Sequence, residues 1–295
     1  MILGTGDFAY NRLFRVMNNK IVIEAGNSGG NFWKDLKAYR GLFYFLAWRD
    51  VLVRYKQTSI GIAWSVLRPL LTIVAFTGFG MIFGADTGGI PRPLLVAAAV
   101  LPWNLFATSF VESANSLVGN ANLLTKVYFP RIIVPASTLI VSLIDFFIAL
   151  VILIVLLMVY GFAPSSNIVF FPLFVLLALI TAAGAGFLIA ALNVRYRDFR
   201  YVVPFIVQVG LFVSPIAFDS GVYIHANEEV PTWVKFMYSL NPMVGVIDGF
   251  RWALLGGELQ IHWNAFIISA VISLVLLFLG IAYFRKVEST FADIV

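Results

Sequence analysis

One short motif has the spacing of a hydrolase nucleophile. Gly26-Asn-Ser-Gly-Gly30 matches the G-x-S-x-G pattern, in which a serine attacks a carbonyl carbon with a histidine as base. That chemistry needs a strand before the serine and a helix after it, whereas this glycine-rich stretch is typical of a flexible linker. The predicted transmembrane topology also places Ser28 on the opposite side of the membrane from His225 and His262, the only histidines in the sequence. We therefore expect no catalytic residue in this chain.

The sequence has few of the side chains that metal and thiol chemistry require. The sequence contains no cysteine and two histidines. Disulfides, thiolate ligands and cysteine nucleophiles are thereby excluded, and a metal site is not expected.

Phenylalanines that share helical faces form a second candidate set. An aromatic ring can stack on the apolar face of a sugar, but it also packs well against lipid or another helix. Packing explains any single residue better, and as a set they are candidates for lining a conduit. They are Phe76, Phe79 and Phe83, Phe106 and Phe110, and Phe205 and Phe212.

The composition excludes an ordinary soluble domain. Hydrophobic residues make up 61% of the 295 residues and charged residues 12%, against about 45–50% and about 25% in soluble proteins. A soluble fold of this size could not bury so much apolar surface, so a bilayer must be part of the solvent. The net charge is +5, and the basic residues cluster at the ends of apolar runs. Lysines and arginines in such places mark the cytoplasmic face of a membrane protein, which argues against nucleic-acid binding.

Apolar runs of about 20 residues predict six transmembrane helices. One run is too long for a single crossing, and Gly161–Asn167 supplies the turn that divides it. Lysine and arginine crowd the loops on one side, which places both termini in the cytoplasm. The expected spans cover residues 64–85, 93–118, 132–160, 168–194, 201–218 and 263–284.

Asp145 falls near the middle of the third expected span. It could relay protons, or it could be a structural carboxylate satisfied by another helix. An ionised aspartate at the bilayer centre costs about 2.5–3.5 kcal/mol, so either role needs an inward position or a partner. Glu112 and Arg68 lie nearer to span ends and can snorkel or pair. Without a second ionisable group at the same depth, we favour the structural role.

The regions outside the spans complete an all-α membrane protein. Residues 1–30 predict a cytoplasmic tail, 31–58 a basic amphipathic interface helix, 59–285 the six-helix transmembrane domain and 286–295 a cytoplasmic tail. The interface helix could merely anchor the first span or also present charge to a cytoplasmic partner. Between the last two spans, 231–240 and 242–255 predict short re-entrant external helices hinged at Asn241-Pro242.

Several stretches resemble ABC-2 type permeases, particularly those that export bacterial polysaccharides such as O-antigen, capsule or teichoic acid. The resemblance covers most of the chain from about residue 20. Arg68 departs from it, because the family often has glutamine before this proline. The resembling stretches are Leu46–Trp64 with Leu67–Leu70, Lys126–Pro135, Asn193–Phe199 with Ser214–Ile216, and Leu240–Met243 with Gly249–Arg251.

The resemblance implies a half-transporter rather than an enzyme. Two copies would pair around a conduit in the bacterial inner membrane, and two separate ATPase subunits would dock below and bind ATP and Mg. The sequence itself has no G-x-x-x-x-G-K-[ST] phosphate loop and implies no cofactor of its own. The loop 120–131 resembles the family's coupling helix. The implied contacts with the ATPase or with lipid headgroups are Arg49, Asp50, Arg54, Tyr55, Lys56, Asn120, Lys126 and Arg131.

The implied substrate is a lipid-linked polysaccharide of the O-antigen type. The nearest alternative is an ABC-2 exporter of teichoic acid, capsule, drug or lipid. A different class is an ATP-independent secondary transporter, and an intramembrane enzyme is a third. Genes for glycosyltransferases beside this one would favour polysaccharide.

Overall fold

The computed structural model describes residues 32–56, 62–82, 87, 89–126, 129–196, 198–225, 227–256, 259, 261–288 and 291. The expected N-terminal tail, Ser28 and Phe83 lie outside these residues. The chain divides into two units, Met1–Ala38 and Tyr39–Val295. In the first unit the structure describes the seven-residue helix α2 (Phe32–Ala38).

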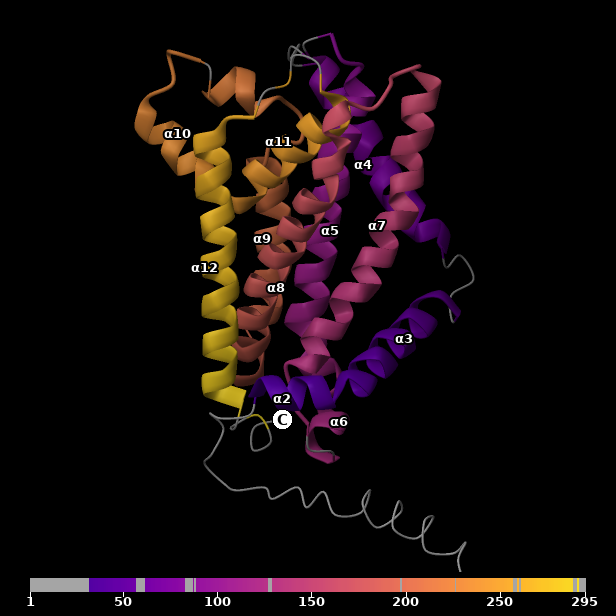
Figure 1. The fold of residues 1–295 in the computed structure, drawn as a ribbon, viewed down its shortest axis with the longest axis vertical. Coiled ribbons are helices and arrows are strands. Elements are labelled where there is room, and N and C mark those ends of the chain that lie inside the picture. The colour runs from indigo at the N-terminus through magenta and orange to yellow at the C-terminus, as the bar shows by residue number, and fades with distance from the viewer. Residues whose placement is uncertain are drawn as a thin grey trace, which may run out of the picture. The chain divides into compact units, whose positions relative to one another are not determined.

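The described residues of the second unit form helices and connecting turns (Figure 1). The expected interface helix, residues 31–58, is two helices separated at Tyr39, of which α3 belongs to this unit. The helices are α3 (Arg40–Lys56), α4 (Ile62–Ile82), α5 (Arg92–Gly119), α6 (Ala121–Lys126), α7 (Ile133–Val159), η1 (Ser166–Phe170), α8 (Phe171–Arg195), α9 (Phe199–Val213), η2 (Gly221–His225), α10 (Thr232–Ser239), α11 (Pro242–Leu255) and α12 (Trp263–Val287).

Five of these helices are long and apolar enough to cross a membrane. They are α4 over Ala63–Ile82, α5, α7, η1 with α8, and α12, with lengths of 20 to 30 residues. At about 1.5 Å per residue they reach about 30–45 Å, which matches or exceeds the hydrocarbon core of a bilayer. The expected turn between the third and fourth spans is confirmed, and Gly161 takes a positive φ of 60° there.

The fifth expected span is shorter than its apolar sequence suggests. α9 has 15 residues and ends at Val213, so it reaches about 22 Å. Ser214 is extended, with φ −83° and ψ 153°, because Pro215 disfavours a helical conformation in the residue before it. The count of six complete spans therefore stays a prediction.

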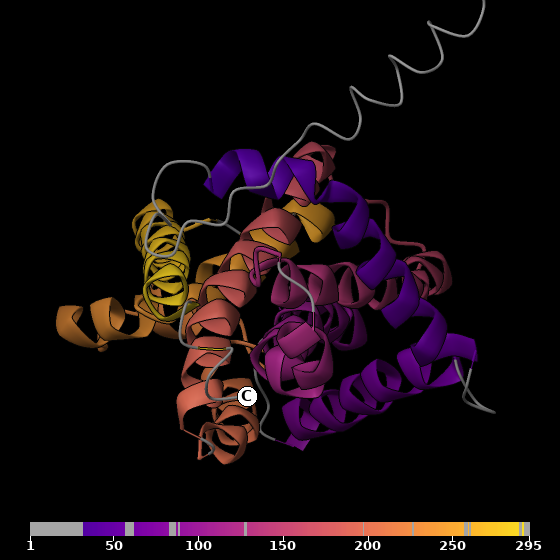
Figure 2. The ribbon, with the colours of Figure 1, turned by 90° about the horizontal axis from the view of Figure 1, so that it is seen from below.

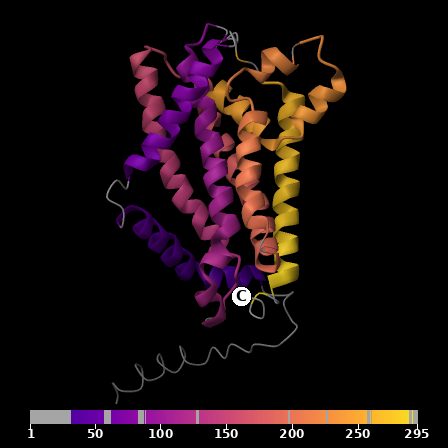
Figure 3. The same cartoon turned by 180° about the vertical axis from the view of Figure 1, so that it is seen from behind.

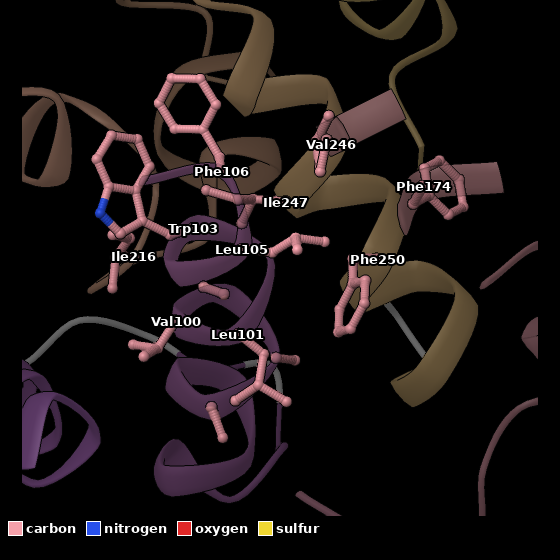
Figure 4. Close-up of a cluster of buried hydrophobic side chains, with 14 of the residues drawn as sticks. Val100, Leu101, Trp103, Leu105, Phe106, Phe174, Ile216, Val246, Ile247 and Phe250 are labelled. Carbon is pink, nitrogen blue, oxygen red and sulfur yellow. The ribbon is translucent and has the colours of Figure 1, made fainter. Parts of the chain in front are cut away.

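α5 is the central helix of the unit. Of its most apolar window, 83% is buried, against 22% for α12. It contacts α4, α7, α8, α9 and α11, and it lies among its neighbours in the view from below (Figure 2). Leu105 of α5 lies beside Ile247 and Phe250 of α11 in the buried cluster (Figure 4). α5 thus supplies the fixed surface on which the other helices pack.

The two short helices expected before the last span are confirmed as α10 and α11. They lie at the opposite end of the bundle from α6 (Figures 1 and 3). Asn241 caps α11 by accepting a hydrogen bond from the Met243 amide at 3.0 Å, and its side chain donates to Ser214 Oγ at 3.1 Å. Pro242 stands at the start of α11, where the missing amide hydrogen costs nothing. This link joins the end of α9 to the start of α11.

Small residues bring α8 and α12 into backbone contact. A Cβ at Gly184 would overlap the Leu277 backbone, and one at Gly280 would overlap the Gly184 carbonyl. Thr181 Oγ1 donates to Ser273 Oγ at 2.8 Å across the same contact. Small side chains at such crossings let membrane helices approach closely.

Gly184→Ala is expected to lower the free energy of unfolding by about 1–3 kcal/mol, because a methyl group forced against backbone is overpacking. Thermal unfolding of the purified chain in detergent measures the change. Gly78→Ala in α4 is the matched control, since a Cβ there meets nothing within 4 Å. The control should be neutral or stabilising by about 0.5–1 kcal/mol. Equal effects of the two substitutions would show that the α8–α12 contact is looser than described.

Candidate functional site

The far end of α3 reaches the middle of α7 and the start of α4. α3 runs obliquely past α7 in both side views (Figures 1 and 3). Arg54 Nη2 lies 2.9 Å from Asp145 Oδ2. Tyr55 Oη and Ser65 Oγ donate to Asp145 Oδ1 at 2.5 and 2.6 Å. The expectation that other helices satisfy Asp145 is confirmed, and we call these four residues the Asp145 cluster.

A second link ties the middle of α3 to the turn between α5 and α6. Arg49 Nη2 lies 2.7 Å from Asp50 Oδ1 and donates to Asn120 Oδ1 at 2.8 Å. Asn120 follows the last residue of α5, and its side chain donates to the Ser116 carbonyl at 2.9 Å. α3 is therefore attached at one point to the α5–α6 turn and at another to α7.

Arg131 is attached to the segment after α12. Its backbone amide donates to Glu288 Oε1 at 2.5 Å, its guanidinium donates to the Glu288 carbonyl, and it lies over the Phe291 ring. Burial raises the pKa of Glu288, and the amide and guanidinium of Arg131 oppose that shift. The loop before α7 is thereby joined to the end of the chain's last long helix.

The eight predicted contact residues thus fall into separate groups. Arg49, Asp50 and Asn120 lie together, whereas Arg54 and Tyr55 point at Asp145 and Arg131 at Glu288. Lys56 and Lys126 are exposed. Sequence reasoning missed Ser65 and Glu288 as partners, since a serine early in a span and a glutamate in a tail carry no pattern of their own.

The predicted conduit phenylalanines divide into buried and exposed sets. Phe106 and Phe110 are buried and stack at 5.8 Å between ring centroids, so they fill the core of a single chain. Phe79, Phe205 and Phe212 are 53%, 66% and 65% exposed. Phe76, which is buried, contacts both Phe79 and Phe212, at 6.3 and 6.0 Å.

The contact between Phe76 and Phe212 joins α4 to α9, and both helices carry exposed phenylalanine rings. We call the exposed side chains Phe79, Phe205, Gln208 and Phe212 the α4–α9 face. Gln208 lies three residues after Phe205 and four before Phe212, so the three share one side of α9. A polar amide among exposed rings is unfavourable against lipid and suits a surface that meets protein or water.

A buried arginine holds the α10–α11 end together. Arg251 is 1% exposed. Its guanidinium donates to three backbone carbonyls, Leu95 at 3.0 Å, Phe218 at 2.8 Å and Ile216 at 3.0 Å. One side chain of α11 thereby joins the start of α5 to the segment that follows α9.

Two histidines near this end resist protonation. The His225 and His262 rings lie 5.0 Å apart, and Lys235 Nζ donates to the His225 carbonyl at 2.9 Å. Burial, then the neighbouring His262 and Lys235, lower the pKa of His225 to about 4, while Asp219 opposes the shift. Burial also lowers the pKa of His262. No cluster of three or more metal-ligating side chains occurs among the described residues.

Acid should therefore destabilise this end of the molecule. The pKa of His225 is lower in the folded chain than its ordinary 6.5, so its contribution is present above about pH 6.5 and is lost as the pH falls toward 4. Between about pH 7.5 and about pH 5, the melting temperature should fall further for the wild type than for His225→Gln. Burial raises the pKa of Asp248 to about 7, so Asp248 makes the folded state relatively more stable as the pH falls. The wild type and His225→Gln share this contribution, which therefore cancels when the two are compared. Equal falls would contradict the prediction.

The comparisons with known proteins agree on one family. The protein-family model described as ABC-2 type transporter matches residues 41–255 of this chain. The O-antigen export system permease protein RfbA of Myxococcus xanthus is 28% identical over 261 residues, covering 88% of this chain and 97% of that protein. RfbA of Klebsiella pneumoniae is 26% identical, covering 83% and 92%. The capsule polysaccharide export inner-membrane protein CtrC of Neisseria meningitidis serogroup B is 22% identical, covering 87% and 94%.

The matched region runs from the first turn of α3 to the last residue of α11, so it includes the Asp145 cluster, the Arg49–Asn120 link and Arg251. Together with five helices of spanning length, the match identifies a multi-pass membrane permease. The chain belongs to the ABC-2 type transporter family.

Proposed function

We propose that this chain is the transmembrane subunit of an ATP-binding-cassette exporter for a lipid-linked polysaccharide of the O-antigen type. Two copies pair around a conduit in the bacterial cytoplasmic membrane, and two separate ATPase subunits bind ATP and Mg and supply the energy. The observation that carries the proposal is the alignment with a protein named for O-antigen export, which covers 88% of this chain.

The proposed orientation places the end of the bundle that carries α6 in the cytoplasm. Lysines and arginines gather in the segments at that end, including Lys126, Arg131, Arg195 and Arg285, as expected for cytoplasmic loops. Both termini then lie in the cytoplasm, and α9 with the segment after it completes a sixth crossing. α10 and α11 lie on the external side.

The α4–α9 face is the surface that we assign to the conduit and to the second copy. Its exposed rings suit the apolar faces of sugars, and Gln208 can hydrogen-bond to hydroxyl groups. Individually weak contacts fit a path in which a polymer must bind and be released repeatedly. Phe106 and Phe110 are left out of this surface, because they are buried within one chain.

The links of α3 offer a route from the ATPase to the spanning helices. An ATPase subunit that moved α6 would move Asn120, which is bonded to Arg49 of α3. α3 would pass that motion to α7 through Arg54 and Asp145. The predicted contacts Lys56 and Lys126 are exposed and remain available to the ATPase or to lipid headgroups.

Deletion of the gene tests the proposal. Cells that lack this chain should keep finished lipid-linked polymer inside and lose it from the surface, and a plasmid copy should restore export. The identity of the polymer that disappears from the surface also shows whether the substrate is O-antigen, capsule or teichoic acid. Normal surface polymer in the deletion strain would refute the proposal.

The second candidate is a capsule exporter, favoured by the similarity to CtrC. The lower identity, 22% against 28%, ranks it behind O-antigen export. An ATP-independent transporter is distinguished by a separate strain that lacks only the gene for the proposed ATPase partner. Transport would continue in that strain.

A further inference from the structure

A pocket lined by apolar and charged side chains lies between α3, α4, α5 and α7, beside the Asp145 cluster. Its volume is about 230 Å³, below the about 300–1,000 Å³ typical of sites for drug-sized ligands. The lining includes Arg54, Arg68 and Asp145, together with polar groups from the middle of α5. A cavity of this size, with charged side chains in a mainly apolar wall, suits the head group of a lipid rather than a polymer.

One arginine of the pocket lining has no carboxylate partner among the described ion pairs. The other, Arg54, forms an ion pair with Asp145 at 2.9 Å and a longer one, at 3.5 Å, with Glu112, which lies outside the lining. Arg68, also in the lining, takes part in none of the ion pairs found among the described residues, and its guanidinium lies 5.9 Å from the centre of the Trp64 ring. Arg68 is exposed near the start of α4, where a guanidinium is available for charge-assisted hydrogen bonds to a phosphate.

One wall of the pocket also carries a hydroxyl group without a partner. Ser142 is 0% exposed, and its Oγ has no hydrogen-bond partner in the described structure. A buried hydroxyl that makes no hydrogen bond costs about 1–3 kcal/mol. Asn104 and Thr108 of α5 add polar atoms to the same lining. The pocket therefore combines a cation with hydrogen-bonding groups, a set that suits an anionic, oxygen-rich ligand.

We propose that this pocket binds the phosphate of a lipid head group, with Arg68 as its principal cation. The hydrocarbon chain of such a lipid would remain in the bilayer. The phosphate could belong to an anionic phospholipid or to the diphosphate of a lipid carrier. The second source rests on the proposed export function, whereas phosphate binding itself does not.

Photolabelling of the full-length chain in lipid nanodiscs tests the proposal. Three probes carry a diazirine near the head group: phosphatidylglycerol, a polyprenyl diphosphate, and a glycosyl diacylglycerol that has no phosphate. Mass spectrometry then measures labelling of the α4 and α5 peptides that line the pocket. Arg68→Gln removes the cation, and Ser142→Ala removes the orphan hydroxyl. Arg195→Gln is the matched control, because Arg195 also lies over a neighbouring aromatic ring, Tyr196, but outside the pocket.

Phosphate probes should label the pocket in the wild type, and Arg68→Gln should reduce that labelling about tenfold, as expected for one charge-assisted contact. Ser142→Ala should reduce it about threefold, and Arg195→Gln should not change it. Preference for the diphosphate would identify a lipid carrier, and equal labelling by phosphatidylglycerol would identify a phospholipid site; both support phosphate binding. Equal labelling by the glycolipid, or no effect of Arg68→Gln, would overturn it. The gene deletion is read out separately, so either idea can fail alone.

Discussion

Asp145→Leu should destabilise the folded chain by about 2–3 kcal/mol, less than the cost of breaking a fully buried ion pair, because the Arg54 side chain is 27% exposed and also lies 3.5 Å from Glu112. Asp145 has a side chain only 13% exposed, and it accepts hydrogen bonds from Tyr55 and Ser65 besides its 2.9 Å ion pair with Arg54. Leucine would leave that guanidinium without its nearest carboxylate and two hydroxyl donors without their acceptor. Thermal unfolding of the purified chain in detergent measures the loss.

A double-mutant cycle separates the ion pair from general damage to packing. Arg54→Met combined with Asp145→Leu removes both charges, and the double variant should lose less than the sum of the single variants, by about 1–3 kcal/mol. Arg49→Met with Asp50→Leu is the matched control, because these side chains are 36% and 24% exposed and such pairs contribute about 0–1 kcal/mol. Additive losses at Arg54 and Asp145 would contradict the coupling.

Arg251→Met should cost at least about 2 kcal/mol. The substitution would leave the non-helical carbonyls of Ile216 and Phe218 without this donor, and each unsatisfied buried acceptor costs about 1–3 kcal/mol. The Leu95 carbonyl would lose the donor that ties it to α11 but lies within helix α5. Arg251→Lys should recover part of the loss, because an ammonium group keeps the charge without the planar fork of donors.

Proteolysis and thermal unfolding measure the effect of Arg251→Met, with cleavage expected first in the segment after α9. Arg200→Met, which changes an exposed arginine, should alter the melting temperature little. An Arg251→Met chain as stable as the control would mean that water or another residue satisfies these carbonyls.

The long helices could be predicted because their cause is local. Apolar runs of sufficient length must be helical in a bilayer whatever their neighbours do. The end of α9 has an equally local cause, Pro215, but an apolar sequence runs past it to Phe218 and suggested a longer span. A proline inside an apolar run indicates the end of a helix more strongly than the hydropathy around it indicates a longer one.

The phenylalanines show where sequence reasoning stops. Phe106 with Phe110 and Phe205 with Phe212 have the same kind of helical spacing, yet the first pair is buried and the second is exposed. Hydropathy does not distinguish a ring that faces its own chain from one that faces lipid or a second copy. Likewise, the partners of Asp145 come from segments at least 80 residues away in sequence, and only the paths of α3 and α4 past α7 bring them together.

The glycine contact between α8 and α12 restricts how a permease of this kind can change shape. Where Gly184 meets Gly280 the two backbones touch, so no flexible side chain is present to take up sliding or rolling. These helices are expected to move as one rigid body. Displacements that widen a passage must then arise between helices that meet through long side chains. The contact between α4 and α9, formed by the rings of Phe76 and Phe212, is of this kind.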